Sequence, residues 1–94
     1  MLSQAPIDLG KVKQNEVDKE ALRLAMIAEL DAVSLYEQLA AVVKKDDLRK
    51  VLLEVAREEK THVGEFQALL LKYDEEQAEE LDKGRKEVEE LTEK

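Results

Sequence analysis

The feature that most constrains the fold is a run of residues between positions 48 and 73 that recurs at alternating steps of four and three. Such a heptad pattern places all of its members on one stripe of an α-helix, which is typical of helices that pack along one another. The stripe consists of Leu48, Leu52, Val55, Glu59, His62, Phe66, Leu69 and Tyr73. We therefore predict a long helix whose packing face carries a carboxylate and an imidazole.

A second stripe precedes the first and adds another acid. Residues that recur seven apart predict a helix from about residue 17 to residue 43, with Asn15 as its N-cap. This stripe consists of Leu22, Glu29, Tyr36 and Val43. The sequence KKDD at residues 44–47 predicts a turn, with Asp46 or Asp47 capping the next helix. The two long helices are therefore expected to form an antiparallel hairpin.

The two ends of the chain differ from the hairpin. Residues 1–14 show no helical period, so we predict a flexible N-terminal arm there and one helical domain over residues 15–94. The sequence DEEQ resembles a capping box formed by Asp74 and Gln77, and it predicts a short third helix. No segment alternates as a β-strand does. The predicted fold is all-α: a two-helix hairpin followed by a short C-terminal helix.

Composition and charge limit the partners of such a chain. A chain of 94 residues buries only a thin core by itself, which favours self-association. The net charge of −8 argues against nucleic acid and anionic membranes as partners and favours metal cations. The absence of cysteine excludes disulfides and zinc–thiolate sites. No apolar run approaches the roughly 20 residues of a membrane span, and the first residues lack the pattern of a signal peptide.

The polar residues on the two stripes need a compensating partner. A buried carboxylate without a partner is costly, and the same stripes carry no Lys or Arg. Glu29 and Glu59 lie at similar distances from the turn, so an antiparallel hairpin brings Glu29 opposite Glu59 and His62. Carboxylates and imidazole are together suited to divalent metals. We therefore predict that these three residues bind a metal ion.

Simpler explanations exist for individual residues. His62 alone could be a core histidine bonded to a carboxylate, but that explanation leaves the two glutamates unaccounted for. Tyr36 lies two turns after Glu29 on the same face, and it suits core packing as well as a position beside the metal. The Glu-x-x-His motif of Glu59 and His62 is half of a di-iron ligand set, since ferritin-like bundles use two such motifs and two further glutamates. A second copy of the chain would supply the missing half.

The segments MIAELDAVSLYEQLA and LLEVAREEKTHVGEFQALLLKYD resemble the encapsulated ferritin-like proteins, which are short helical relatives of ferritin. The resemblance implies that two hairpins dimerise into a ferritin-like four-helix bundle with a di-iron centre shared by two chains. It implies that Glu29, Glu59 and His62 are ligands of that centre, with Glu59 bridging the irons and Glu29 terminal. Tyr36 matches a tyrosine near the centre, and Asp31 matches an acid that guides iron inward. Ala28 replaces an acid that some relatives carry.

The resemblance also implies a function and a location. Such proteins are ferroxidases, which oxidise Fe(II) to Fe(III) with dioxygen. They assemble as a ring of five dimers, a decamer, and pass iron to a surrounding encapsulin nanocompartment in the cytoplasm. The tail EVEELTEK does not look like a peptide that targets the encapsulin shell protein. We therefore expect either a shortened chain or a native fusion to a shell protein.

Two other classes of function fit the same residues. A different di-metal carboxylate enzyme, such as a peroxidase or a relative of manganese catalase, could use the same ligands. A non-catalytic helical assembly module would bind no metal tightly and would tolerate apolar residues at positions 29, 59 and 62. An electron carrier of the rubrerythrin kind is disfavoured, because the chain has no cysteine for a rubredoxin-type iron centre.

Overall fold

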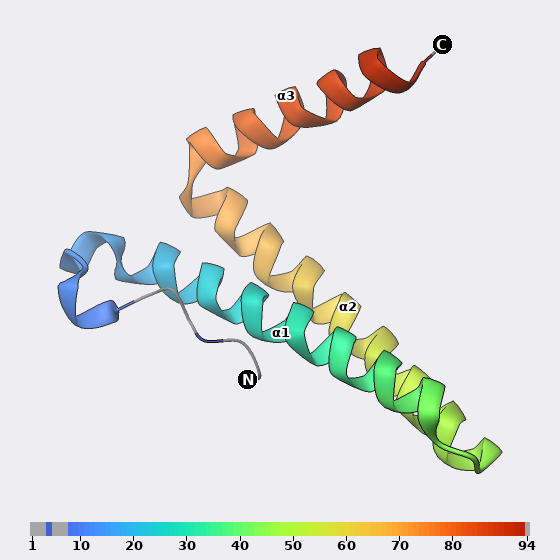
Figure 1. The fold of residues 1–94 in the computed structure, drawn as a ribbon. Coiled ribbons are helices and arrows are strands. Elements are labelled where there is room, and N and C mark those ends of the chain that lie inside the picture. Colours follow the sequence, from blue (N-terminus) through green and yellow to red (C-terminus); the bar gives the residue numbers. More distant parts are fainter. Residues whose placement is uncertain (1–3, 5–7, 94) are drawn as a thin grey trace.

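The computed structural model describes residue 4 and residues 8–93, and it is built of helices (Figure 1). Two short 3-10 helices, η1 (Leu9–Lys11) and η2 (Gln14–Glu16), precede the long helices α1 (Val17–Val42) and α2 (Asp46–Tyr73). Helix α3 (Glu75–Thr92) follows after a single linking residue. The part of the chain that the structure describes contains no strand. The prediction of an all-α hairpin with a short third helix is confirmed.

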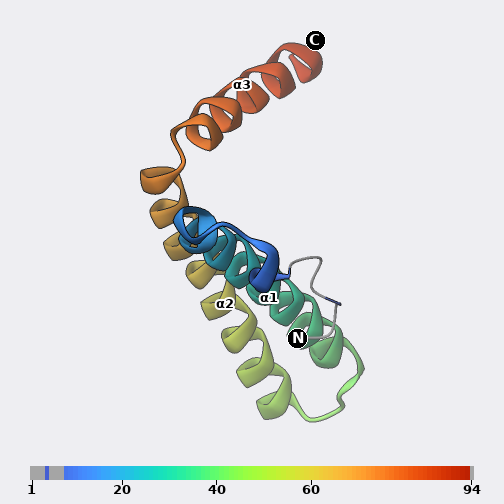
Figure 2. The ribbon, with the colours of Figure 1, turned by 90° about the vertical axis from the view of Figure 1, so that its left-hand side faces the viewer.

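Helices α1 and α2 lie side by side and antiparallel, whereas α3 leaves the hairpin at a wide angle (Figures 1 and 2). The radius of gyration is 16.6 Å, well above the roughly 12 Å of a compact domain of this length. Every residue from position 79 to position 93 is exposed. The third helix therefore touches the hairpin only through its first turns.

The predicted helix caps are wrong for α1 and α2. Helix η2 continues directly into α1, so Glu16 rather than Asn15 occupies the N-cap, and no side chain caps the helix. Lys45 precedes α2 and likewise makes no side-chain cap. Asp46 and Asp47 lie in the first turn instead, where their negative charge favours the helix N-terminus. The helix boundaries nevertheless agree with the prediction to within two residues.

The sequence pattern predicted neither of the two 3-10 helices in the N-terminal part of the chain. Residues 1–3 and 5–7 lie outside the described residues, but Leu9–Lys11 forms a 3-10 turn. The side chain of Asp8 caps this turn by accepting a hydrogen bond from the Gly10 amide at 3.0 Å. The division into an arm over residues 1–14 and a domain over residues 15–94 remains a prediction.

The buried core is thin and is displaced from the heptad stripe of α2. Among the described residues only Val33, Ala40, Ala56 and Leu70 are buried hydrophobic side chains. Ala56 and Leu70 each follow a stripe residue by one position, which turns them about 100° around the helix toward α1. The stripe itself therefore lies at the edge of the hairpin contact, and its members Leu48, Leu69 and Tyr73 are exposed. One side of the hairpin is left apolar and uncovered.

Asp74 joins α2 to α3 and fixes the direction of the third helix. Its carboxylate accepts a hydrogen bond from the Gln77 amide at 3.1 Å, which confirms the predicted N-cap of this helix. The other carboxylate oxygen accepts a hydrogen bond from Arg23 on α1 at 2.9 Å. Asp74 is the one buried charged residue in the described chain. Its side chain thus ties α3 to both helices of the hairpin.

Replacing Asp74 should loosen the start of α3. Asp74→Ala removes both the cap and the ion pair with Arg23, and loss of a cap alone costs about 0.5–2 kcal/mol of helix stability. Asp74→Asn keeps a capping oxygen and should lose less. We expect amide hydrogen exchange at Gln77 to accelerate most in Asp74→Ala. Asp82→Ala, at an exposed acid on the same helix, is the control; equal exchange in the two alanine variants would contradict the role of Asp74.

Candidate metal centre

Glu29, Glu59 and His62 meet at one point of the hairpin. The His62 Nδ1 atom lies 3.3 Å from Glu29 Oε2 and 3.4 Å from Glu59 Oε2. One ligand atom from each residue falls within a group whose members all lie within 4.8 Å of one another. No other group of acids, histidines and cysteines in the described chain has this geometry. The fold therefore brings these three residues together, as the sequence pattern predicted.

The backbone explains why the three side chains converge. Glu59 and His62 are three residues apart on α2, so they lie on one face of that helix. Glu29 projects from the antiparallel helix α1 at the same depth and completes the cluster from the other side. The two helices are long and continuous at this point, so the positions of the ligand atoms are set by regular backbone rather than by loops.

Neither carboxylate of the cluster has a cationic side chain as its partner. Among the ion pairs of the described residues, those of Glu29 and Glu59 involve His62 only. Lys60 is the sequence neighbour of Glu59, but its ammonium group pairs with Glu37 at 2.9 Å. The side chains of Glu29 and Glu59 are only 20% and 18% exposed. Two mostly buried carboxylates beside one imidazole form a donor set that suits a divalent cation.

The cluster is open on one side and incomplete for two metal ions. The His62 side chain is 43% exposed, so the imidazole lies at the surface of the hairpin. One chain supplies three ligand residues, whereas a di-iron centre of the ferritin-like kind uses four glutamates and two histidines. No fourth acid of the described residues joins the group. A centre of that kind would need further ligands from beyond the described residues.

Exposed apolar residues lie on the same side of α2 as His62, before and after the cluster along the helix. Leu69 and Tyr73 follow His62 on the stripe of α2, and Leu48 precedes it; all three are exposed. Val51 is exposed as well and borders the stripe on the same side of α2, because it lies four residues before Val55. Val51 was not among the predicted stripe residues, although its spacing from Val55 is visible in the sequence. We call the cluster together with Leu48, Val51, Leu69 and Tyr73 the metal face.

The other predicted site residues are not members of the cluster. Tyr36 is half-buried on α1, two turns after Glu29, and its side chain makes no hydrogen bond within the described part of the chain. Asp31 is two residues from Glu29, which turns it about 200° around the helix and away from the ligands. Ala28 offers no ligand atom. The roles expected for Tyr36 and Asp31 therefore remain predictions.

Comparisons with known proteins agree on the relationships of the chain. The family model described as Rubrerythrin matches residues 20–94. A ferritin-like–encapsulin shell fusion protein from Pyrococcus furiosus is 56% identical over 94 residues, which is 98% of this chain and 27% of that protein. The chain thus spans about a quarter of the length of this curated relative.

One solved structure is also similar to this chain. The crystal structure of the encapsulated ferritin domain from Pyrococcus furiosus superposes with a TM-score of 0.84 at 54% sequence identity. The match covers 100% of this chain and 98% of that one, so it includes the hairpin and the third helix. No helix in the described residues is long and apolar enough to cross a membrane. The chain belongs to the rubrerythrin family and to the encapsulated ferritin-like proteins that its sequence resembles.

Proposed function

We propose that the chain is a ferroxidase that oxidises Fe(II) with dioxygen at a di-iron site shared by two copies. The observation that carries this proposal is the grouping of Glu29, Glu59 and His62 at a partly exposed site on a helix face that also carries exposed apolar residues. Two copies that dock through their metal faces would bring together four glutamates and two histidines. This is the ligand set of ferritin-like di-iron bundles.

The donor set supports iron as the substrate. Carboxylates bind Fe(II) and, even more tightly, the harder Fe(III) ion, while a single imidazole per ion completes the set. His62 presents Nδ1 to the carboxylates, and in the tautomer that carries its proton on Nε2 this atom has a lone pair that can bind a metal ion. Two Fe(II) ions held by these residues would each give up one electron, and dioxygen would take up both electrons with two protons from solvent to give hydrogen peroxide. In this proposal Glu59 bridges the ions and Glu29 binds one of them terminally.

The surroundings support a dry, cation-attracting site. The apolar residues of the metal face would exclude water once a second copy covers them, which strengthens the interaction of the glutamates with the ions. The net charge of −8 raises the local concentration of Fe(II). Tyr36 is proposed to lie beside the iron pair, and Asp31 is proposed to attract iron on its way to the site. Asp31 would act at a distance, since it projects away from the ligands.

The names of the relatives support a partner and a location. One relative is named as a fusion to an encapsulin shell, and the other is named as an encapsulated ferritin domain. We propose that this chain likewise works with an encapsulin shell protein, inside a nanocompartment, where the shell receives the Fe(III). A homodimer is the proposed catalytic unit, and a ring of five such dimers is the proposed assembly.

Mixing the anaerobic Fe(II)-loaded protein with dioxygen tests the reaction. We expect ferric absorbance to grow together with oxygen consumption, and hydrogen peroxide to be consumed more slowly than dioxygen. Zn(II) has the same charge as Fe(II) but no redox chemistry. Preloading the protein with Zn(II) should therefore abolish the rapid growth of ferric absorbance. A peroxidase or a manganese catalase relative would instead turn over peroxide rapidly. Unchanged oxidation after Zn(II) loading would assign the signal to free iron and contradict the proposal.

A further inference from the structure

An ion pair crosses the hairpin on the edge opposite the metal cluster. The Lys60 Nζ atom of α2 lies 2.9 Å from Glu37 Oε2 of α1. Lys60 is two residues before His62, which turns it about 200° around the helix. The buried side chains of Ala56 and Leu70 lie between these two directions on α2. The contact between the long helices is therefore bounded by the cluster on one edge and by this ion pair on the other.

A second ion pair has the same antiparallel alignment. Arg23 of α1 donates a hydrogen bond to Glu20 on its own helix and another, at 2.9 Å, to Asp74 directly after α2. On α1, Arg23 precedes Glu37 by two heptads. On the returning chain, Asp74 follows Lys60 by the same interval. Both ion pairs are therefore satisfied by one register of the two helices, and the sign of the charge on each helix reverses from one pair to the other.

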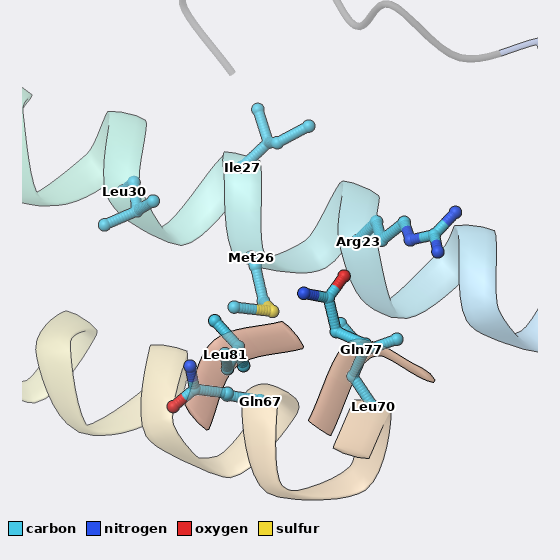
Figure 3. Close-up of a pocket in the computed structure, with 8 residues that line it drawn as sticks. All are labelled: Arg23, Met26, Ile27, Leu30, Gln67, Leu70, Gln77 and Leu81. Carbon is cyan, nitrogen blue, oxygen red and sulfur yellow. The ribbon is translucent and has the colours of Figure 1, made fainter. Parts of the chain in front are cut away.

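The residues midway between the two ion pairs carry no charge. Leu30 on α1 and Gln67 on α2 are each one heptad from both pairs, and they line the same groove. Figure 3 shows Arg23 and Leu30 on α1 and Gln67 on α2. Displacing α2 by one heptad in either direction would place Gln67 opposite Arg23 or opposite Glu37 and would break both ion pairs. The charges on this edge therefore favour one register over its neighbours.

The rest of the hairpin contact does little to fix the register. Two of its four buried hydrophobic residues are Ala40 and Ala56, and a methyl group offers little shape to resist the sliding of one helix along the other. Sliding by a single turn would move a ligand by about 5.4 Å. The ligand atoms of the metal cluster all lie within 4.8 Å of one another, so a slip of one turn would separate them.

We propose that Glu37 and Lys60 are positioning residues of the metal cluster. Their side chains are 46% and 60% exposed, so the ion pair adds little to stability, but interhelical ion pairs of this kind set the orientation of packed helices. The pair favours the register in which Glu29 meets Glu59 and His62. It thereby raises the fraction of chains that can bind a divalent cation, and the apparent dissociation constant falls in proportion. This inference rests on the proposed metal site, but it does not depend on oxidation.

Zn(II) titration of two charge reversals at one protein concentration tests the positioning role. We expect Glu37→Lys and Lys60→Glu each to raise the Zn(II) dissociation constant about threefold or more, because each places like charges opposite one another. Glu37→Lys combined with Lys60→Glu should restore the unsubstituted value. Net charge alone predicts the opposite for Lys60→Glu, since a more negative chain should bind a cation more tightly. Lys60→Gln, which removes the attraction without adding repulsion, should weaken binding by a smaller factor.

Arg57→Glu is the matched control. Arg57 is exposed and pairs with Glu54 on its own helix, so this substitution changes the charge as Lys60→Glu does without touching a contact between α1 and α2. We expect it to bind Zn(II) at least as tightly as the unsubstituted protein. Circular dichroism checks that all variants keep their helix content. Weakening of Zn(II) binding by Arg57→Glu to the same degree as by Lys60→Glu would overturn the proposal.

The remaining outcomes separate positioning from a merely structural role and from the proposed reaction. If the two reversals lower the melting temperature but leave the Zn(II) dissociation constant unchanged, or if the combined variant fails to restore it, the positioning role is wrong. If the unsubstituted protein binds no Zn(II), the metal site and this inference fail together. If it binds Zn(II) and responds to the reversals as expected but does not oxidise Fe(II), only the ferroxidase proposal fails.

Discussion

Replacing Glu59 or His62 by alanine is expected to slow oxygen-dependent Fe(II) oxidation by more than about 100-fold while the helix content stays unchanged. Residues that merely orient a metal ligand contribute about 10–100-fold, so loss of a ligand should exceed that range. In the proposed shared site each substitution would remove two ligands, one from each copy. The residues lie within a long regular helix, and alanine has the highest helix propensity, so the substitutions should leave the helix intact. Stopped-flow ferric absorbance and circular dichroism measure the two effects.

Glu58→Ala is the matched control for this experiment. Glu58 is the same residue type one position away, it is exposed, and it is not a member of the metal cluster. We expect it to oxidise Fe(II) at the rate of the unsubstituted protein. Full activity in both Glu59→Ala and His62→Ala would remove the cluster from the mechanism. An equal loss of Fe(II) oxidation in Glu58→Ala would mean that the reaction depends on the acidic surface of α2 and not on the cluster.

Fe(II) under anaerobic conditions is expected to strengthen dimerisation. Ions held between two copies bind the dimer and not the free chain, so free Fe(II) at a hundred times its dissociation constant adds about 2.7 kcal/mol. For a domain of this size each kcal/mol raises the melting temperature by about 4–8 °C, so the shift should reach about 10–20 °C. Analytical ultracentrifugation and thermal melts with and without metal measure the linkage.

Glu29→Ala separates shared binding from nonspecific binding of cations. This variant keeps nearly all of the negative surface charge but lacks the α1 ligand, so Fe(II) should neither raise its melting temperature nor shift its association. Zn(II) should reproduce the effect in the unsubstituted protein, because the linkage depends on binding and not on oxidation. Identical sedimentation of the unsubstituted protein with and without Fe(II) would show that the site is not shared between copies.

Much of the candidate site could be predicted because helices are regular. The spacing of Glu59 and His62 fixes their relative direction on α2, and the position of the KKDD turn fixes the depth at which Glu29 faces them. The capping role of Asp74 was equally accessible, since its partner lies three residues away in the sequence. The spacing of residues in the sequence is enough to predict which side chains meet wherever one helix or one tight turn determines the geometry.

Other features depend on contacts that sequence spacing does not contain. The heptad stripe predicted which residues of α2 share a face, but not that Ala56 and Leu70, one position away, would be the ones packed against α1. The rotation of each helix about its axis follows from side-chain volumes on both helices. Likewise Asn15 had a suitable side chain for a cap, but the 3-10 turn before α1 moved the helix start to another residue. The ion pair between Arg23 and Asp74 joins residues that are 51 positions apart in the sequence, so local spacing could not predict it.

Asp74 is the single residue between α2 and α3, so a small rotation there moves the far end of α3 by a much larger distance. Helix α3 has 18 residues and is about 27 Å long, so a rotation of about 10° at its first residue moves its far end by about 5 Å. That displacement is the size of a whole side chain at Leu91, whereas the metal cluster on the hairpin does not move at all. A substitution at this one linking residue is therefore expected to displace the far end of α3 while Glu29, Glu59 and His62 keep their positions on the hairpin.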